Sequence, residues 1–573
     1  MPWILLLRLS MAECPNFSES RQVFFGDLHV HTHLSLDASA QGTRITPDEA
    51  YAFAQGEPLV IRGGSVQIDP LHFVALTDHS EFLGEQALCT DPESERYKHP
   101  LCWLHRRHEN LAFLLFHMQL ARPWFGDPNV KEVPRKNLCG RADIHCRLAA
   151  IEPWQNIQSD AHNANKNCQF TTFVGYEWTG SPRTTNLHRN VLFSDLDVPK
   201  RPISYFEAPT PQKLWHALAE ECVPEDDCEV ITIPHNANLG GGQMFLPYDN
   251  TAREGLVDYA EWRAKYEPLV EIFQHKGSSE CGPMSSDEQC AFEQLPYGNL
   301  TADIFGKIAG GEPNPADSVR WALGEGLAYA EAGLSNPYQY GLVASTDTHL
   351  GTPGLTSESD FIGHGGLGKT KDAPIVDNVW FNPGGLTGVW AEENTRSSIF
   401  SALQRREAFG TSGPRIAIRM FGAEDFPEDI CSNKDRAEFG YFFGAPMGGE
   451  LSEIDSPVFL VEARQDQTPL VELQIVKIWR DGDEPREKVI SIHSDTQESD
   501  MCIRWQDPDY DPSKWVAYYS RVLEVPTHRW TALRCSAISC SETPRHACCG
   551  DLPPRQVQER AWSSPIWIAP HDQ

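Results

Sequence analysis

The chain has 573 residues, more than one hydrophobic core usually spans, so we expect a large domain and a smaller one. Its formal net charge of −32, from 80 acidic and 48 basic side chains, disfavours binding to nucleic acid or to anionic lipid. Hydrophobic residues make up 40% of the chain, which is enough for a buried core, and no stretch approaches the roughly 20 apolar residues of a membrane span.

The 16 cysteines indicate an oxidising compartment. The closely spaced ones are Cys139/Cys146, Cys222/Cys228, Cys281/Cys290, Cys535/Cys540 and Cys548/Cys549. None has the Cys-x-x-Cys spacing of structural zinc sites, so we interpret them as disulfides. The apolar residues 3–7 are interrupted by Arg8 and follow no charged segment. We therefore expect either a periplasmic or secreted protein whose signal peptide lies upstream, or a cytoplasmic protein.

An apolar run from Phe24 leads into His29 and His31, and the two-residue period of a β-strand places both imidazoles on one face. Two imidazoles so placed can bind one metal ion. Asp37 follows after a turn, and residues 46–49 (TPDE) have the capping box and first-turn proline of a helix start. A strand followed by a helix indicates a β/α unit.

Short apolar runs of the buried parallel type recur along the chain, and His, Asp or Glu residues lie at their ends. The predicted strands cover residues 73–77, 170–176, 230–233, 269–273 and 342–346, and a further apolar run lies at 191–193. The candidate metal ligands are His29, His31, Asp37, His79, Glu177, His188, His235, Asp347 and His349. Such residues at successive strand ends indicate a barrel whose active site lies at the carboxyl ends of its strands.

The rest of the chain divides by texture. Residues 84–167 are irregular apart from an apolar helical stretch at 111–116, and we interpret them as a surface insertion or a lid. Further helices are predicted from residues 211, 318 and 395. Beyond residue 421, alternating strands at 458–463, 472–479 and 515–522 predict a β-sandwich-like region. The expected domains are an extension (1–21), a barrel (22–420) and a β-rich domain (421–573).

The order Asp-x-His-x-His-Thr, Thr-Asp-His, a single Glu, Pro-His and Asp-x-His resembles that of the polymerase and histidinol phosphatase (PHP) superfamily of metal-dependent phosphoesterases. More closely, the chain resembles a bacterial branch catalogued as domain of unknown function 3604. The segments that carry this closer resemblance are 25–32 (FGDLHVHT), 188–191 (HRNV), 410–415 (GTSGPR) and 559–567 (ERAWSSPIW). The resemblance covers nearly the whole chain. It implies an α/β fold, a distorted (β/α)7 barrel, with two or three divalent metal ions.

The resemblance also implies an assignment of the ligands. His29, His31 and Asp347 would bind a first metal ion, and Glu177 would bridge it to another. Zinc is the expected metal, with manganese or iron as alternatives, because mixed imidazole and carboxylate shells suit all three.

A second ion would be bound by His79, His349 and Asp37, and a third, where present, by His188 and His235. Asp37 stands where trinuclear relatives can carry a histidine. The number of ions therefore stays open between two and three.

Other residues next to these ligands have supporting roles in this interpretation. Asp27, Asp78 and Glu271 would accept hydrogen bonds from the imidazoles and orient them, and proton transfer is an alternative, catalytic role for Asp78. The loop residues that could hold an anionic group are Arg183, Arg189, Asn236, Lys276 and Ser278.

We therefore expect hydrolysis of a small phosphate mono- or diester by a hydroxide that bridges two metal ions. Hydrolysis of a sulfate, carboxylic or carbamate ester at the same site is the alternative. A metal-stabilised binding protein is the non-enzyme interpretation, and the ligand set argues against it because structural zinc sites prefer closed, mostly cysteine shells. The expected partner is a small anionic ester.

Overall fold

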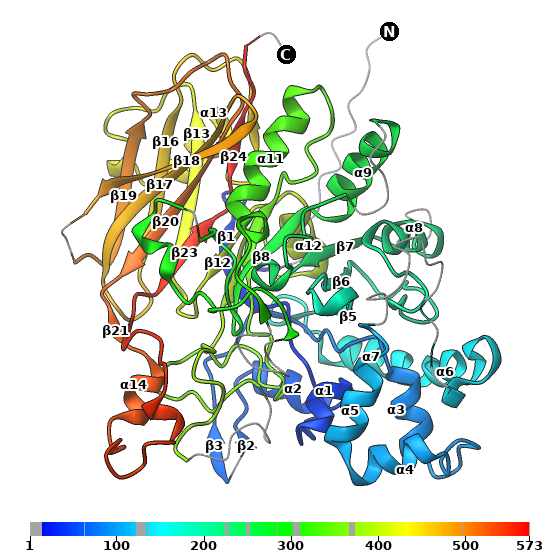
Figure 1. Cartoon of the computed structure of the whole chain (residues 1–573). Helices are drawn as coiled ribbons and strands as arrows, with labels where there is room; N and C mark the ends of the chain where they lie inside the picture. Colours follow the sequence, from blue (N-terminus) through cyan, green and yellow to red (C-terminus); the bar gives the residue numbers. More distant parts are fainter. Residues whose placement is uncertain are drawn as a thin grey trace.

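The computed structural model describes residues 14–61, 63–121, 133, 135, 137–223, 228–247, 253–283, 285–301, 310–365, 373–494 and 497–571. Helices and strands alternate through the first two thirds of the chain, and the last third forms the stacked strands drawn in yellow to red in Figure 1. Of the predicted N-terminal extension, residues 1–13 lie outside the described residues.

The central sheet contains β1 (Gln22–Asp27), β4 (Phe73–Ala75), β5 (Thr171–Trp178), β6 (Arg189–Phe193) and β7 (Val230–Pro234), side by side in this order. β1, β4 and β5 pair in parallel, whereas β6 is antiparallel to both of its neighbours. The antiparallel β6 lies outside the strands predicted from the sequence. The short link from β5 to β6 leaves no room for the crossover that a parallel strand needs.

Two further parallel strands, β8 (Leu269–Gln274) and β10 (Gly341–Ala344), form a separate small sheet with β9 (Gly277–Ser278). β8 contacts β7, and β10 contacts β12 (Ala408–Thr411). Among the described residues no strand pairing joins β7 to β8 or β10 to β12, so the paired strands form an open mixed sheet. The (β/α)7 barrel stays a prediction.

The central sheet continues into the C-terminal region. β11 (Leu386–Ala391) is antiparallel to both β1 and β12, β12 pairs with β23 (Arg560–Ser563), and β23 pairs with β20 (Val516–Glu524). β17 (Leu470–Asp481) extends the sheet beyond β20. The division at residue 420 stays a prediction, and hydrogen-bonded strands cross it.

A second sheet in the C-terminal region contains β14 (Ala445–Pro446), β13 (Ala417–Ala423), β16 (Val458–Arg464) and β19 (Asp500–Gln506). Its buried side chains pack with those of β17 and β20 in one apolar cluster, so two sheet faces share a core as in a sandwich. The predicted strands of this region are confirmed as β16, β17 and β20. The remaining strands are β2 (Leu59–Ile61), β3 (Gly64–Val66), β15 (Glu450–Leu451), β18 (Glu484–His493), β21 (Thr527–His528), β22 (Gln556–Val557) and β24 (Ile566–Ile568).

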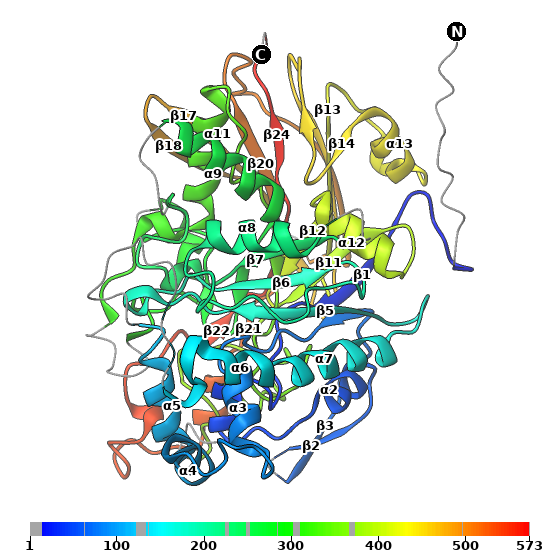
Figure 2. The same ribbon diagram turned by 90° about the vertical axis from the view of Figure 1, so that its right-hand side faces the viewer.

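The predicted helix starts are confirmed because each has a capping side chain. Thr46 and Glu49 form the capping box of α2 (Pro47–Ala54). The hydroxyls of the other three N-cap residues accept backbone hydrogen bonds. They precede α8 (Pro211–Glu221), α11 (Val319–Glu331) and α12 (Arg396–Gln404). In Figure 2, β5, β6 and β7 lie between α8 and α7 (Ile151–Ala164). Within the described residues, no helix has the length and apolar character needed to cross a bilayer.

Residues 84–167 are more regular than their sequence indicates. They contain α3 (Leu83–Thr90), α4 (Pro100–Arg107), α5 (Glu109–His117), α6 (Ile144–Ala149) and α7, and residues 122–132, 134 and 136 lie outside the described part. The disulfides Cys89–Cys102 and Cys139–Cys146 tie these short helices together. These helices are too short to show a clear apolar period in the sequence, and the disulfides help to stabilise them.

All 16 cysteines are paired, in eight disulfides. Three of the five close pairs are confirmed, but the last four cysteines pair as Cys535–Cys548 and Cys540–Cys549 instead of with their nearest neighbours. The other bridges include Cys14–Cys168 and Cys431–Cys502, which join distant segments. Full pairing is consistent with an oxidising environment.

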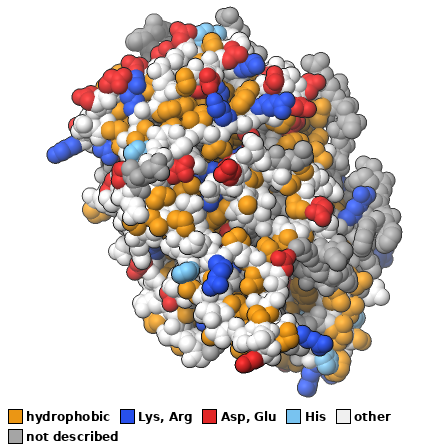
Figure 3. Space-filling view, turned by 60° about the vertical axis from the view of Figure 1, so that its left-hand side comes forward, with side chains coloured by type: hydrophobic (Ala, Val, Ile, Leu, Met, Phe, Trp, Pro, Cys, Tyr) orange, Lys and Arg blue, Asp and Glu red, His pale blue; other side chains and the backbone are white. Residues whose placement is uncertain are grey.

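On the face drawn in Figure 3, charged side chains of both signs are interspersed.

Removal of a disulfide that closes a long loop should destabilise the protein more than removal of one that closes a short loop. The double substitution Cys431→Ser/Cys502→Ser opens a bridge with a sequence separation of 71 and should lower the free energy of unfolding by about 4 kcal/mol. Cys540→Ser/Cys549→Ser, with a separation of 9, is the matched control and should cost about 2.5 kcal/mol. Urea unfolding of both variants measures the difference, and equal losses would contradict it.

Candidate metal centre

The ends of five strands meet at one edge of the sheets. His29 and His31 follow β1, and an isolated bridge joins Val30 to Thr348, beyond the end of β10. A second bridge joins His79, beyond β4, to Glu177 in β5. His235 follows β7, and Asp347 and His349 follow β10. His188 directly precedes the antiparallel β6, which brings it to the same edge from the opposite chain direction. Eight of the nine candidate ligands therefore converge at this edge, and the ninth, Asp37, reaches them from a helix.

Glu177 is the centre of this arrangement. Its two carboxylate oxygens lie within 3.3 Å of imidazole nitrogens of five histidines: His29, His31, His79, His188 and His235. The shortest of these contacts, 2.6 Å, joins Oε1 to Nδ1 of His188. Burial opposes the ionisation of Glu177, but the imidazoles of His79, His235 and His188 hold the pKa of this carboxyl well below its usual range.

Asp347 supplies a second shared carboxylate. Its Oδ1 lies 3.2 Å from Nε2 of His29 and 3.1 Å from Nε2 of His31, and its Oδ2 accepts hydrogen bonds from Lys276 and Gln274. Burial opposes the ionisation of Asp347, but the imidazole of His29 and the ammonium group of Lys276 hold its pKa well below the usual range. Its φ of +52° is uncommon for a residue other than glycine, and such backbone positions cluster at functional sites.

Asp37 lies in the short helix α1 (Leu36–Ala40) and contacts two imidazoles with one oxygen. Its Oδ2 lies 2.9 Å from Nε2 of His349 and 3.1 Å from Nε2 of His79. Burial opposes its ionisation, but the two imidazoles hold the pKa of Asp37 well below its usual range. Each of the three carboxylates at this edge is thus shared between imidazoles.

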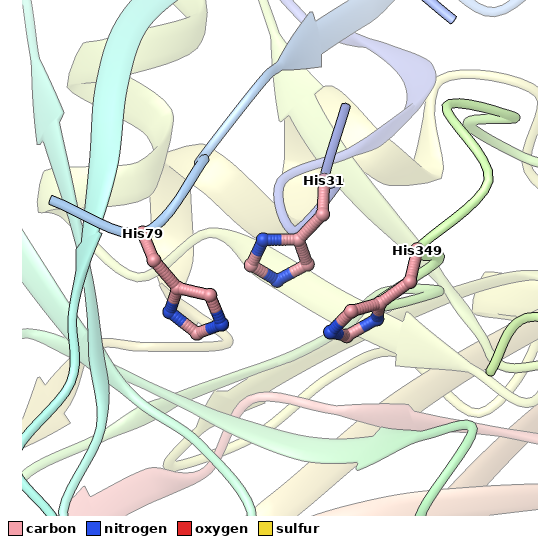
Figure 4. A group of neighbouring side chains, drawn as sticks. All are labelled: His31, His79 and His349. Carbon is pink, nitrogen blue, oxygen red and sulfur yellow. The ribbon is translucent and has the colours of Figure 1, made fainter. Parts of the chain in front are cut away.

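The donor atoms fit divalent cations. His31, His79 and His349 approach one another from three separate segments (Figure 4), and their donor atoms lie within 4.8 Å of one another. Nε2 of His29 lies only 3.3 Å from Nε2 of His31. Two such nitrogens can share at most one proton, so at least one lone pair faces the other ring and the nearby carboxylates. A cation between these atoms would satisfy both, and the imidazole and carboxylate set suits zinc, manganese or iron.

The structure brings together two further sets of donors with the same spacing. The sets are His29, Glu177 and His235, and His29, His31 and Asp347. His29 belongs to both, and Nδ1 of its ring lies 3.2 Å from Oε2 of Glu271, where an orienting acceptor is predicted. The rings of three other histidines are oriented by hydroxyls, in the contacts Ser35–His31 (2.8 Å), Thr179–His79 (2.7 Å) and Ser181–His188 (2.7 Å).

Among the described residues, Asp78 has no hydrogen bond or ion pair with an imidazole, which corrects the predicted direct contact. Its carboxylate accepts hydrogen bonds from the backbone N–H and hydroxyl of Thr32, at 2.7 and 2.8 Å, and from those of Ser35, at 3.1 and 2.8 Å. The hydroxyl of Ser35 in turn contacts the ring of His31. Asp78 therefore positions a ligand through Ser35, and this location disfavours the predicted catalytic role.

Asp27 also bonds to the chain rather than to a ring, which corrects its predicted role. It accepts hydrogen bonds from the backbone of His29 and Gly354 and, at 2.6 Å, from the hydroxyl of Thr346. Burial raises the pKa of Asp27 to about 6, against the opposing effect of these hydrogen bonds. Asp27 holds the end of β1 against the end of β10, and thereby sets the spacing of the ligands that follow both strands.

Of the predicted anion-binding residues, Lys276 lies at the centre, where its ammonium group donates to Asp347. Asn236 is buried beside it, and its amide oxygen accepts from Gln274. For Arg189 the predicted anion-binding role is corrected. Its guanidinium is fully buried and pairs with Glu267 at 2.7 Å, so it stabilises the fold.

Ser278 lies in β9, and its hydroxyl accepts a hydrogen bond from the backbone of Glu280 at 3.2 Å, so it bonds away from the ligands. Arg183 is exposed in the turn η4 (Pro182–Thr184). In the described part of the chain, neither residue has a hydrogen bond or ion pair with a candidate ligand that would support its predicted role.

His275 is a buried residue of the centre that the sequence analysis missed. Its Nε2 lies 3.4 Å from Oδ2 of Asp347, and its ring stacks on that of His349 with an interplanar angle of 4°. These two residues and His275 form a further set of convergent donors. The signal was present in the sequence, because His275 follows β8 as the predicted ligands follow their strands.

Loss of a central ligand should reduce metal binding while the fold persists. His31→Ala and Glu177→Ala should each lower the affinity for zinc by at least about tenfold, because each residue belongs to a convergent donor set. His33→Ala is the matched control, since His33 lies two residues away and its ring contacts the carbonyl of Ile45 instead. Elemental analysis after dialysis measures bound metal. Unchanged metal content in the Glu177 variant would contradict the ligand assignment.

Comparisons with known proteins give a family but no activity. An uncharacterised protein of Chlamydia pneumoniae is 22% identical over 426 residues, which cover 72% of this chain and 49% of that protein. The chain thus spans about half the length of this curated relative. No solved structure shows a significant match. The family model described as "Protein of unknown function (DUF3604)" matches residues 18–501 and 490–570, which confirms the predicted branch. The chain therefore belongs to this family of unknown function.

Proposed function

We propose that this protein is a metal-dependent hydrolase that cleaves a small phosphate mono- or diester. The observation that carries the proposal is the carboxylate of Glu177, which five buried or nearly buried imidazoles share. A structural zinc site would be closed and mostly built from cysteine, whereas here every cysteine is in a disulfide. The order of the ligand motifs resembles the PHP superfamily, and we include membership of that superfamily and its barrel in the proposal.

Three sets of residues would hold two or three divalent ions, with zinc as the first choice and manganese or iron as alternatives. The sets are His29, His31 and Asp347; His79, His349 and Asp37; and His188 and His235, with Glu177 shared. When bound, such ions activate water as a nucleophile near neutral pH and neutralise charge on the ester oxygens.

Residues of the chain would bind and orient the substrate. The side chain of Lys276 is only 16% exposed, and its ammonium group pairs with Asp347 at the centre. An anionic oxygen of the substrate can take a place beside it, because a partly buried cation forms strong charge-assisted hydrogen bonds. Ser35, Thr179 and Glu271 hold the imidazoles in place and need not move during the reaction.

Lys276 also bears on the alternative substrates. A sulfate ester shares the anionic oxygens that this side chain would bind, so sulfate ester hydrolysis is the second candidate. Carboxylic and carbamate esters lack that charge, and the lysine favours them less. We further propose a periplasmic or secreted location, supported by the eight disulfides.

The proposal is tested by a screen of zinc- or manganese-loaded protein against aryl phosphate, phosphodiester, sulfate and acetate esters. Phosphate esters should be hydrolysed with the highest kcat/KM. Lys276→Ala should lower kcat/KM on phosphate esters by at least about tenfold, mainly through KM, and leave acetate hydrolysis within about twofold.

Lys488→Ala is the control for this experiment, because Lys488 carries the same charge in β18 with 51% of its side chain exposed. Its variant should match the unmodified protein on every ester. Fully metal-loaded protein that hydrolyses none of the four ester classes would overturn the proposed function and favour a metal-stabilised binding protein.

A further inference from the structure

A cavity of about 920 Å³ is lined by residues other than the candidate metal ligands. It lies between the loop 354–360, which continues from the ligand His349, and segments of the C-terminal region. Those segments are the turn 466–468, the end of β20 at Glu524, and Glu559 next to β23. The cavity therefore joins the two predicted domains at a place that the proposed hydrolysis does not use.

Its wall is strongly acidic. Six of the lining side chains are carboxylic acids: Asp69, Glu358, Asp360, Asp466, Glu524 and Glu559. Among the described residues that line it, Arg415 is the one guanidinium, and no lysine is present. The guanidinium of Arg415 is already engaged by the backbone carbonyls of Asp69 and Pro70. The lining therefore carries a large excess of groups that attract a cation.

Among the lining acids, Glu524 is the buried one with an unpartnered carboxylate oxygen. It is 1% exposed, and its Oε1 has no hydrogen-bond partner within the described part of the chain. A buried carboxylate oxygen without a partner is costly, and proteins normally supply a donor or a cation. Here the charged group that acts on Glu524 is another acid, Asp466, which repels it.

Burial is the main cause that raises the pKa of two of these acids, and the guanidinium of Arg560 lowers the pKa of Glu559 only in part. Burial, with repulsion from Asp466, raises the pKa of Glu524 to about 8. Burial, with repulsion from Glu293 and Glu524, raises the pKa of Glu559 to about 8 despite a hydrogen bond from Ser412. Near neutral pH these groups hold protons, and a cation that enters the cavity would displace them.

We propose that this cavity binds a small organic cation with two or more amino or guanidinium groups. A metal ion fits less well, because no three of these carboxylates appear among the described groups whose donor atoms lie within 4.8 Å of one another. Acids spread over a cavity of this volume match the separated charges of an extended molecule. The unpartnered Oε1 of Glu524 then accepts a hydrogen bond from one cationic end, and the exposed Asp466 attracts another.

The test is titration calorimetry of the full-length, metal-loaded protein with spermidine at about 0.1 M salt. Glu524→Gln and Asp466→Asn should each weaken binding at least about tenfold. Glu484→Gln is the matched control, because Glu484 lies in β18 with 70% of its side chain exposed. Binding at pH 7, measured in two buffers of different ionisation enthalpy, should release protons, and Glu524→Gln should release fewer.

Several results would overturn the proposal. They are an absence of spermidine binding up to about 10 mM, an equal loss in the Glu484 variant, and calcium binding that is tighter than spermidine binding and is lost in Glu524→Gln. Should Glu524→Gln fail to fold, Asp466→Asn decides alone, because Asp466 is exposed and its substitution leaves the core intact. The metal centre is loaded in every arm, so failure here does not bear on the hydrolase proposal.

Discussion

The structure depends on one arrangement, the sharing of the buried carboxylate of Glu177 among five imidazoles from four places in the chain. Burial of so many polar groups opposes folding unless the groups satisfy one another or bind a common cation. The carboxylates of Asp37 and Asp347 extend the same pattern to both sides. Divalent ions at these positions would turn a costly cluster into a stabilising one, and folding and metal binding would be coupled.

Around this cluster, buried polar side chains hydrogen-bond neighbouring segments together. Asp27 joins the ends of β1 and β10, and Asp78 holds the turn that carries Ser35 against the ring of His31. Both acids bond to backbone and hydroxyl groups, so their effect on the centre is indirect. These hydrogen bonds hold the strand ends in place around the candidate centre, an arrangement that the proposed hydrolysis would use as preorganisation. In the acidic cavity behind the loop 354–360, Oε1 of the buried Glu524 lacks such a partner within the described part of the chain, which is why the proposal there is an outside cation.

Much of this centre could be predicted because strand geometry is local. The two-residue period explains why His29 with His31, and Asp347 with His349, appear as pairs in the sequence and meet in space. Contacts between residues far apart in the sequence could not be predicted, because they leave no local pattern. One example is the buried pair of Arg189 and Glu267. Another is the Cys14–Cys168 disulfide, whose cysteines are 154 residues apart. His275 was predictable by the same strand-end argument, but only the structure shows its ring beside Asp347.

The most direct test of the central claim is a crystal structure of the metal-loaded protein with anomalous data collected at the metal absorption edge. The account predicts two or three strong anomalous peaks among the carboxylates of Glu177, Asp37 and Asp347, each at bonding distance from imidazole nitrogens. A protein that contains metal by elemental analysis but shows no peak within reach of Glu177 would contradict it.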